Sequence, residues 1–346
     1  MSVVKFVCVV AMIWVHAHMA LISDGRFILS TKTFFYRVTS DFMFIGLFLY
    51  ILPVIAGVVL RMDLGGRVVN EKIGGDDFKR ILWSAIWLVL AGFFMSTITW
   101  GFYVTFSWNV LQLIALSFLA IAFLLKEFSV RAVWWLGLGA ILLAAPLREL
   151  WGSYDYIYPV GVFIGANDGF MLWPFFPWFG VVAFGFLTAH YYLKFKDSLK
   201  FRMSLLVVGT SFLLIALLRN EFSPYLDPDF VWGPSLFQPG LGLVLAALGL
   251  FCLLVVLANT LFNKSRFRRY GIINSYSKGI LWIYVVQMFA SQKLAPVIKS
   301  YWPMGQPTLA YFILPVGLLI LSWLVGTLSI KLLQEKSIVI RLRKVK

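Results

Sequence analysis

The sequence predicts an all-α polytopic membrane protein with about ten transmembrane helices and both termini in the cytoplasm. Of its 346 residues, 61% are apolar and 13% are charged, a composition far from that of soluble domains. Apolar runs of about 18 to 24 residues, long enough to cross a bilayer, recur along the whole chain. Lys and Arg gather in alternate loops between these runs, as in membrane proteins of fixed orientation.

The apolar runs define the expected helices, which cover residues 3–22, 41–60, 80–100, 107–125, 132–147, 171–192, 203–219, 239–262, 275–295 and 308–333. No stretch is left for an independent soluble domain, so residues 1–346 are expected to form a single integral-membrane domain. The first run follows Lys5 as in a signal peptide. Because it continues to Ile22 without a small-x-small cleavage site, we expect it to be retained.

The basic residues set the orientation. When the loops are assigned to alternate sides, 22 of the 30 Lys and Arg residues fall on the side of the N-terminus, seven fall on the other, and Lys278 lies inside the ninth helix. This asymmetry places both termini in the cytoplasm and explains the formal charge of +15 without a nucleic-acid partner. The longer outward loops are rich in Tyr, Trp, Pro, Asp and Gly, and form either a site for a polar acceptor or an interfacial aromatic belt: residues 23–40, 148–170, 220–238 and 296–307.

Several classes of protein lack their signatures here. We find no repeat of fixed period and no pair of interrupted helices in matched halves, which counts against a secondary transporter. No segment resembles a Walker loop, a paired-His metal site or a dinucleotide fingerprint, and no metal is expected. Cys8 and Cys252 fall within apolar helices, where we expect thiols to pack as small hydrophobic groups.

The first expected helix, "VVKFVCVVAMIWVHAHMALIS", carries Lys5, His16 and His18. An ionisable group inside a membrane helix is costly and is therefore a functional-site hypothesis. Lys5 and His16 are eleven residues apart, which places them on one helix face and about 16 Å apart along the axis. His18 lies about 200° from His16 around the helix. Only His16 therefore shares the face of Lys5, with Lys5 near the cytoplasmic headgroups and His16 beyond the bilayer centre.

This spacing suits a reaction that crosses the thickness of the membrane. Cations at the cytoplasmic side would hold a phosphorylated donor, while a neutral imidazole deeper in the bilayer acts as general base for a hydroxyl or amine, or accepts an acyl group itself. Structural alternatives stay open: Lys5 as a topology determinant that snorkels to the interface, and His16 as a hydrogen-bonding group between helices. The third histidine, His190, follows an apolar run in "TAHYYLKFK" and is expected to be interfacial.

The segment "VKFVCVVAMIWVHAHM" resembles the first helix of the transmembrane acyltransferase superfamily, which includes the acyltransferase-three and the heparan-alpha-glucosaminide N-acetyltransferase-like proteins. Members typically show an Arg, ten intervening residues and a His, and Lys5 and His16 occupy these positions. Other segments resemble later family helices in the same order: "SDFMFIGLFLYILPVIAG", "NVLQLIALSFLAIAFLL", "FMLWPFFPWFGVVAFGFLTAHYY" and "YSKGILWIYVVQMF". In the last of these, Gln287 stands where the family usually has a His.

The resemblance implies ten helices and the transfer of an acyl group, most often acetyl, from cytoplasmic acyl-CoA (acetyl-CoA) to a hydroxyl or amine of a sugar or glycan acceptor. Polysaccharide modification in the cell envelope would be its setting. The compact chain favours the bacterial cytoplasmic (inner) membrane, with membrane lipid as a partner, and a homo-oligomer is compatible with the sequence. In this hypothesis His16 is the general base, His18 its substitute if the helix is rotated, and Asp41 an orienting carboxylate or a helix N-cap.

The remaining candidates fall into two groups. Cations expected at the cytoplasmic helix ends are candidates for the phosphates of the acyl-CoA: Lys5, Arg61, Lys79 and Arg80. Four further side chains are candidates to line the substrate path, and packing between helices stays open as the role of the three aromatic ones: Trp173, Trp178, Tyr284 and Gln287.

Two other functions stay open. A transporter or flippase of a lipid-linked or polar substrate would use the same His and Lys without chemistry. A non-catalytic partner of a glycan-assembly complex would use its outer aromatic loops.

Overall fold

The computed structural model of the chain describes residues 2–22, 43–151, 157–165, 173–195, 198–219, 239–261, 276, 279–301, 313–329 and 331. These residues are almost entirely helical, and an isolated bridge pairs Val69 with Lys72. The predicted all-α class is therefore confirmed for the described part of the chain.

The α-helices are α1 (Ser2–Ile22), α3 (Met43–Leu64), α4 (Gly75–Trp100), α5 (Val110–Glu127), α6 (Val130–Trp151), α7 (Tyr158–Ile164), α8 (Phe175–Phe195), α9 (Leu199–Leu218), α11 (Leu241–Leu261) and α14 (Ile280–Tyr301). A further apolar helix covers Ile313–Ser329. Each predicted span overlaps one of these helices, with ends displaced by a few residues. The short helix α7 was not predicted, and it lies in the expected outward loop 148–170.

Six of the described helices are long and apolar enough to cross a membrane: α4, α5, α6, α9, α11 and residues Ile280–Ile298 of α14. The chain is therefore an integral membrane protein. The predicted number of about ten crossings and the cytoplasmic position of both termini remain predictions.

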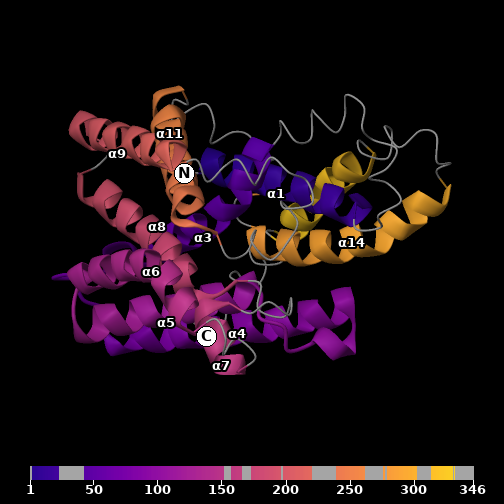
Figure 1. Cartoon of the computed structure of the whole chain (residues 1–346), viewed down its shortest axis with the longest axis horizontal. Coiled ribbons are helices and arrows are strands. Elements are labelled where there is room, and N and C mark those ends of the chain that lie inside the picture. The colour runs from indigo at the N-terminus through magenta and orange to yellow at the C-terminus, as the bar shows by residue number, and fades with distance from the viewer. Residues whose placement is uncertain are drawn as a thin grey trace, which may run out of the picture. The chain divides into compact units, whose positions relative to one another are not determined.

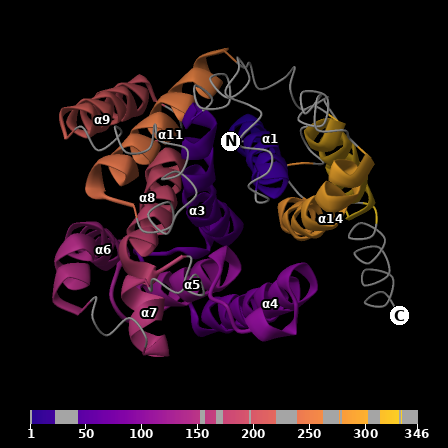
Figure 2. The same ribbon diagram turned by 45° about the vertical axis from the view of Figure 1, so that its right-hand side comes forward.

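The described chain forms two compact units. One contains Met1–Leu49 and Leu257–Lys346, and the other contains Tyr50–Val256, so that the division falls within α3 and α11. In the first unit α1 packs against α14 (Figure 2). In the second, α4 lies beside α5, and α8 packs against α5 and α6 (Figure 1). The expectation of a single domain over residues 1–346 stays a prediction.

Helix α8 is the centre of the second unit. Trp178, Phe179 and Phe186 on this helix are fully buried. The helix is interrupted at Phe176, whose backbone is extended (φ −94°, ψ 124°). Before this break, Trp173 stacks at a tilt on Trp178, with ring centroids 4.6 Å apart, and its carbonyl accepts a hydrogen bond of 2.7 Å from Trp108 Nε1. The predicted helix from residue 171 is therefore wrong at its start, since α8 begins at Phe175.

Helix α5 begins inside a polar cluster that satisfies its first backbone groups. Asn109 Oδ1 accepts from Leu111 N at 2.9 Å, while Gln112 Oε1 accepts from Asn109 N at 3.2 Å. Asn109 Nδ2 donates to Ser96 Oγ on α4 at 3.0 Å. Because Asn109 and Gln112 are buried and a bilayer offers no water to unpaired backbone groups, this cluster supplies partners that a helix end needs.

The crossing of α3 and α8 depends on two glycines. A Cβ added at Gly57 would lie 1.9 Å from the carbonyl oxygen of Val182, and one added at Gly185 would lie 1.9 Å from that of Val54. The two backbones are thus in direct contact. Such close approach is a common way for membrane helices to gain packing energy, since lipid removes the hydrophobic drive between them.

We expect Gly57→Ala to lower the free energy of unfolding by about 1 to 3 kcal/mol, because α3 and α8 must move apart to admit the methyl group. The measurement is thermal unfolding of the purified protein in detergent. Gly139→Ala on α6 is the matched control, because a Cβ there meets nothing within 4 Å. It should be neutral or slightly stabilising. Equal unfolding midpoints for the two variants would contradict the close crossing.

Candidate active site

The first unit brings together three residues singled out in the sequence, His16, Tyr284 and Gln287. Lys5 and His16 lie on one uninterrupted helix, α1, as predicted. His16 is partly buried, and its Nδ1 is 2.7 Å from Nε2 of Gln287 on α14. The edge of its ring faces Tyr284, one turn earlier on α14, with ring centroids 6.0 Å apart and planes inclined by 63°. α14 therefore holds the imidazole from two successive turns.

The Gln287 amide and His16 Nδ1 share a hydrogen bond whose donor depends on the tautomer of the imidazole. Gln287 is completely buried, and its Oε1 has no hydrogen-bond partner among the described residues. The pair thus has one satisfied and one unsatisfied amide atom.

The other candidates of the first helix are less fully described. His18 lies on α1, but its side chain is outside the described residues, and Asp41 lies outside them altogether. Lys5 is partly buried on α1. The two tryptophans proposed to line the substrate path belong to the second unit, where Trp178 is fully buried and Trp173 is 8% exposed. Their rings pack on each other in the helical core.

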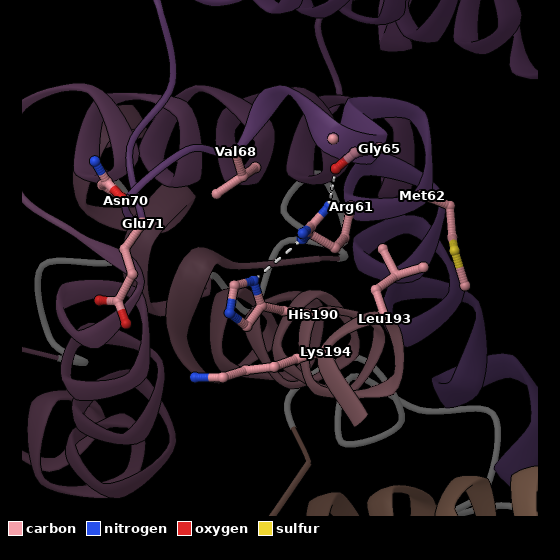
Figure 3. A pocket seen from close by; sticks show the side chains of 10 residues that line it. Arg61, Met62, Gly65, Val68, Asn70, Glu71, His190, Leu193 and Lys194 are labelled. Carbon is pink, nitrogen blue, oxygen red and sulfur yellow. Dashed lines mark hydrogen bonds between the residues drawn. The ribbon is translucent and has the colours of Figure 1, made fainter. Parts of the chain in front are cut away.

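The second unit contains a pocket of about 580 Å³ at the carboxyl ends of α3 and α8. Figure 3 shows Arg61 and His190 bonded to each other there, with Lys194 nearby and Asn70 and Glu71 to one side. The pocket joins residues that are far apart in the sequence, since Arg61 lies in the last turn of α3 and His190 lies in the last turns of α8.

Arg61 is the best-fixed cation of this pocket. Arg61 is buried, with 6% of its surface exposed. Its Nε donates to His190 Nδ1 at 3.2 Å, and its Nη1 donates to the carbonyl of Gly65 at 2.8 Å. His190 therefore accepts at Nδ1 and carries its proton on Nε2. The sequence analysis treated His190 as interfacial and missed this contact, because nothing in the sequence signals a pairing across 129 residues.

A tight turn forms one wall of the pocket. Val69 N donates to Lys72 O at 3.0 Å and Lys72 N donates to Val69 O at 2.9 Å. Between them, Asn70 (φ 49°) and Glu71 (φ 64°) both adopt the left-handed conformation, as a type I′ turn requires. Asn tolerates this conformation, whereas Glu is strained in it. The strain is located on a pocket-lining residue.

The other predicted phosphate ligands differ in their availability. Arg80 Nη2 lies 2.9 Å from Asp63 Oδ2 and 3.6 Å from Asp77 Oδ1, so its charge is already paired with carboxylates. Lys79 is exposed on α4. Among the described residues, no three His, Cys, Asp or Glu side chains are grouped so as to hold a metal ion.

The described helices are those of an integral membrane protein, and each of the two units contains one candidate site. A family model described as heparan-alpha-glucosaminide N-acetyltransferase, catalytic, matches residues 3–226. The chain belongs to this family. The matched residues include His16, Arg61 and His190, whereas Tyr284 and Gln287 lie beyond them. No curated protein and no solved structure gives a significant match.

We expect Glu71→Gly to stabilise the protein by about 1 kcal/mol, because glycine adopts the left-handed conformation without a Cβ penalty. The measurement is thermal unfolding in detergent. Glu71→Ala is the control, since it removes the same carboxylate but keeps the Cβ and therefore the strain. Stabilisation of both variants by the same amount would show that the carboxylate, and not the backbone, is responsible.

Proposed function

We propose that this protein transfers an acetyl group from acetyl-CoA to the amine or hydroxyl of a sugar or glycan, with His16 as the general base. The observation that carries the proposal is the contact between His16 and Gln287, which fixes an imidazole within membrane helices. The family to which the chain belongs is described as a glucosaminide N-acetyltransferase. A glucosamine-type amine is therefore the acceptor that we propose first.

The reaction requires one proton to move twice. The acceptor amine or hydroxyl attacks the thioester carbonyl while its proton passes to the imidazole. The carbon–sulfur bond then breaks, and the imidazolium returns the proton to the departing thiolate. The products are the acetylated acceptor and CoA with a free thiol, so that no oxidant, reductant or metal is consumed.

The pocket of the second unit fits the phosphates of the acyl-CoA. Arg61 and Lys194 supply two positive charges, and His190 is a neutral side chain beside them. Among the described residues Glu71 is the one carboxylate that lines the pocket, so the charge of this lining is net positive at neutral pH. Arg61 is held by its contacts with His190 and Gly65, which reduces the entropy lost when it binds a phosphate. Lys5 and Lys79 are additional candidates, whereas Arg80 is paired with Asp63 and Asp77.

The orientation follows from the positive-inside rule. The pocket lies where α3 and α8 end. The end of α5 lies beside the start of α4, since Ile73 N, just before α4, donates to Leu125 O. The basic residues of these connections favour the cytoplasmic face, where acetyl-CoA is available. A bacterial cytoplasmic membrane, a role in cell-envelope polysaccharide and a homo-oligomer remain parts of this proposal. Transport or a non-catalytic role would require no acetyl-CoA.

Removal of the base tests the catalytic step. We expect His16→Ala to abolish acetyl transfer while acetyl-CoA still raises the unfolding temperature of the detergent-purified variant. His16→Asn is the control for packing, because it retains a polar side chain that can bond Gln287 but cannot take up the proton. We expect it to be equally inactive. Transfer at the wild-type rate in either variant would remove the assignment.

Loss of one pocket charge tests the site of the acyl donor. We expect Arg61→Gln to raise the Kd for acetyl-CoA by about ten- to 100-fold, because a charge-assisted hydrogen bond to phosphate is worth about 1.5 to 3 kcal/mol. Isothermal titration calorimetry in detergent measures this. Arg131→Ala, which removes an exposed cation from the start of α6, is the matched control and should leave Kd unchanged. Equal effects of the two variants would indicate only a general loss of charge.

A further inference from the structure

Arg61 determines which ring nitrogen of His190 carries a proton. A guanidinium donates hydrogen bonds and cannot accept them, so the 3.2 Å contact between Arg61 Nε and His190 Nδ1 requires an unprotonated Nδ1. The neutral imidazole then carries its proton on Nε2. Arg61 is itself held in place, because it is buried and its Nη1 donates to the carbonyl oxygen of Gly65 at 2.8 Å. His190 therefore has a defined N–H donor at Nε2.

This donor is directed into the pocket. In Figure 3 one ring nitrogen of His190 is bonded to Arg61, and the other is turned toward the side on which Glu71 and the amino group of Lys194 lie. His190 and Lys194 are four residues apart on α8, which places them on one face of the helix. Within the described part of the chain, the contact at Nδ1 is the hydrogen bond that the imidazole makes. Its Nε2–H is therefore available to a ligand.

A phosphate group suits the three side chains of this wall. Arg61 and Lys194 are cations and His190 adds a neutral N–H, so all three offer hydrogen-bond donors. Arg61 uses one N–H group for His190 and one for Gly65, which leaves others for a ligand. A phosphate has three strong acceptor oxygens, enough to meet one donor from each side chain.

We propose that His190 is a phosphate-binding residue, and that its uncharged Nε2–H donates to a phosphate oxygen held between Arg61 and Lys194. Arg61 then has two roles, since it binds the phosphate and also keeps His190 in the donor form. The assignment of this phosphate to acyl-CoA rests on the proposed function. The phosphate contact does not, because an anionic phospholipid offers the same group at the membrane surface.

Glu71 competes with the phosphate for this donor. Its carboxylate lines the same pocket, and the turn that carries it is tied to α5, where Lys72 Nζ donates to the carbonyl oxygen of Glu127 at 3.2 Å. A carboxylate held there repels a phosphate and accepts from the same kind of N–H donor. Loss of the charge of Glu71 should therefore strengthen phosphate binding, whereas loss of the donor of His190 should weaken it.

Two substitutions at His190 separate its contact with Arg61 from its contact with the ligand. In His190→Asn the amide oxygen lies near the position of Nδ1 and still accepts from Arg61, but nothing replaces Nε2. In His190→Gln the longer side chain places an amide N–H near the position of Nε2. We expect His190→Asn to raise the Kd for adenosine 3′,5′-bisphosphate, the nucleotide part of CoA, by about tenfold, because a hydrogen bond to a charged group is lost. His190→Gln should restore most of the affinity.

Isothermal titration calorimetry in detergent gives these Kd values. Glu71→Gln, which keeps the length of the side chain and removes its charge, should lower Kd severalfold. Arg131→Ala is again the matched control for loss of an exposed cation and should bind as the wild type does. Wild-type affinity in His190→Asn, or an affinity in His190→Gln as low as that in His190→Asn, would overturn the proposal.

Nitrogen NMR tests the contact without a substitution at His190. The chain contains three histidines, so in protein labelled with ¹⁵N in the imidazole rings the signals that remain in the double variant His16→Asn, His18→Asn belong to His190. In phosphatidylcholine nanodiscs we expect a protonated Nε2 whose signal shifts when adenosine 3′,5′-bisphosphate is added. A shift caused by phosphatidylglycerol without the nucleotide would assign the phosphate to a lipid headgroup. A signal that responds to neither would overturn the contact.

The inference and the proposed function fail in different ways. Because the phosphates of CoA are remote from the reacting thioester, His190→Asn should raise KM for acetyl-CoA with little change in kcat. If His190→Asn binds the nucleotide weakly but His16→Ala still transfers acetyl groups at the wild-type rate, the phosphate contact stands and the proposed function falls. If transfer requires His16 while His190→Asn binds the nucleotide as tightly as the wild type, the function stands and the contact falls.

Discussion

The hydrogen bond between His16 and Gln287 is the interaction on which the functional account depends. Both groups lie on apolar helices, α1 and α14, where water does not compete for them. A buried amide with no partner would cost about 1 to 3 kcal/mol. The bond therefore fixes the rotation of α1 against α14 as well as the orientation of the imidazole. In the proposed function, structure and chemistry are set by the same two side chains.

The second unit achieves its rigidity by other means. Reciprocal close approaches at Gly57 and Gly185 place α3 directly on α8, and large aromatic side chains fill the core around α8. These contacts fix the ends of α3 and α8, where Arg61 and His190 meet. A cation that is held in place before a ligand arrives loses less freedom on binding. The packing of the unit thus contributes to the pocket, although Gly57, Gly185 and the buried aromatic side chains of α8 do not line it.

The sequence was informative where one physical requirement dominates. Bilayer thickness imposes long apolar runs, and each run became a helix. Helical periodicity also placed Lys5 and His16 on one continuous element. The choice of Gln287 came from resemblance alone, because its contact with His16 spans 271 residues and no local pattern encodes it. The pairing of Arg61 with His190 was missed for the same reason, since neither residue signals its partner.

Local backbone features could not be predicted from the sequence either. The break at Phe176 falls inside an apolar run whose composition favours a helix. The helical backbone is interrupted there, and the rings of Trp173 and Trp178 on either side of the break pack on each other. The strained conformation of Glu71 contradicts the usual preference for glycine in such a turn. The conformational preference of a single residue contributes little free energy, and the packing of the surrounding helices decides which backbone conformation it adopts.

The central claim is that His16 and Gln287 interact directly, and a double-mutant cycle measures this. The unfolding free energies of the wild type, His16→Ala, Gln287→Ala and the double variant are compared in the same detergent. The account expects the two losses to be non-additive, with a coupling energy of about 1 kcal/mol, because either substitution alone already breaks the bond. Additive losses would mean that the two side chains act independently, and the arrangement proposed for the active site would then be wrong.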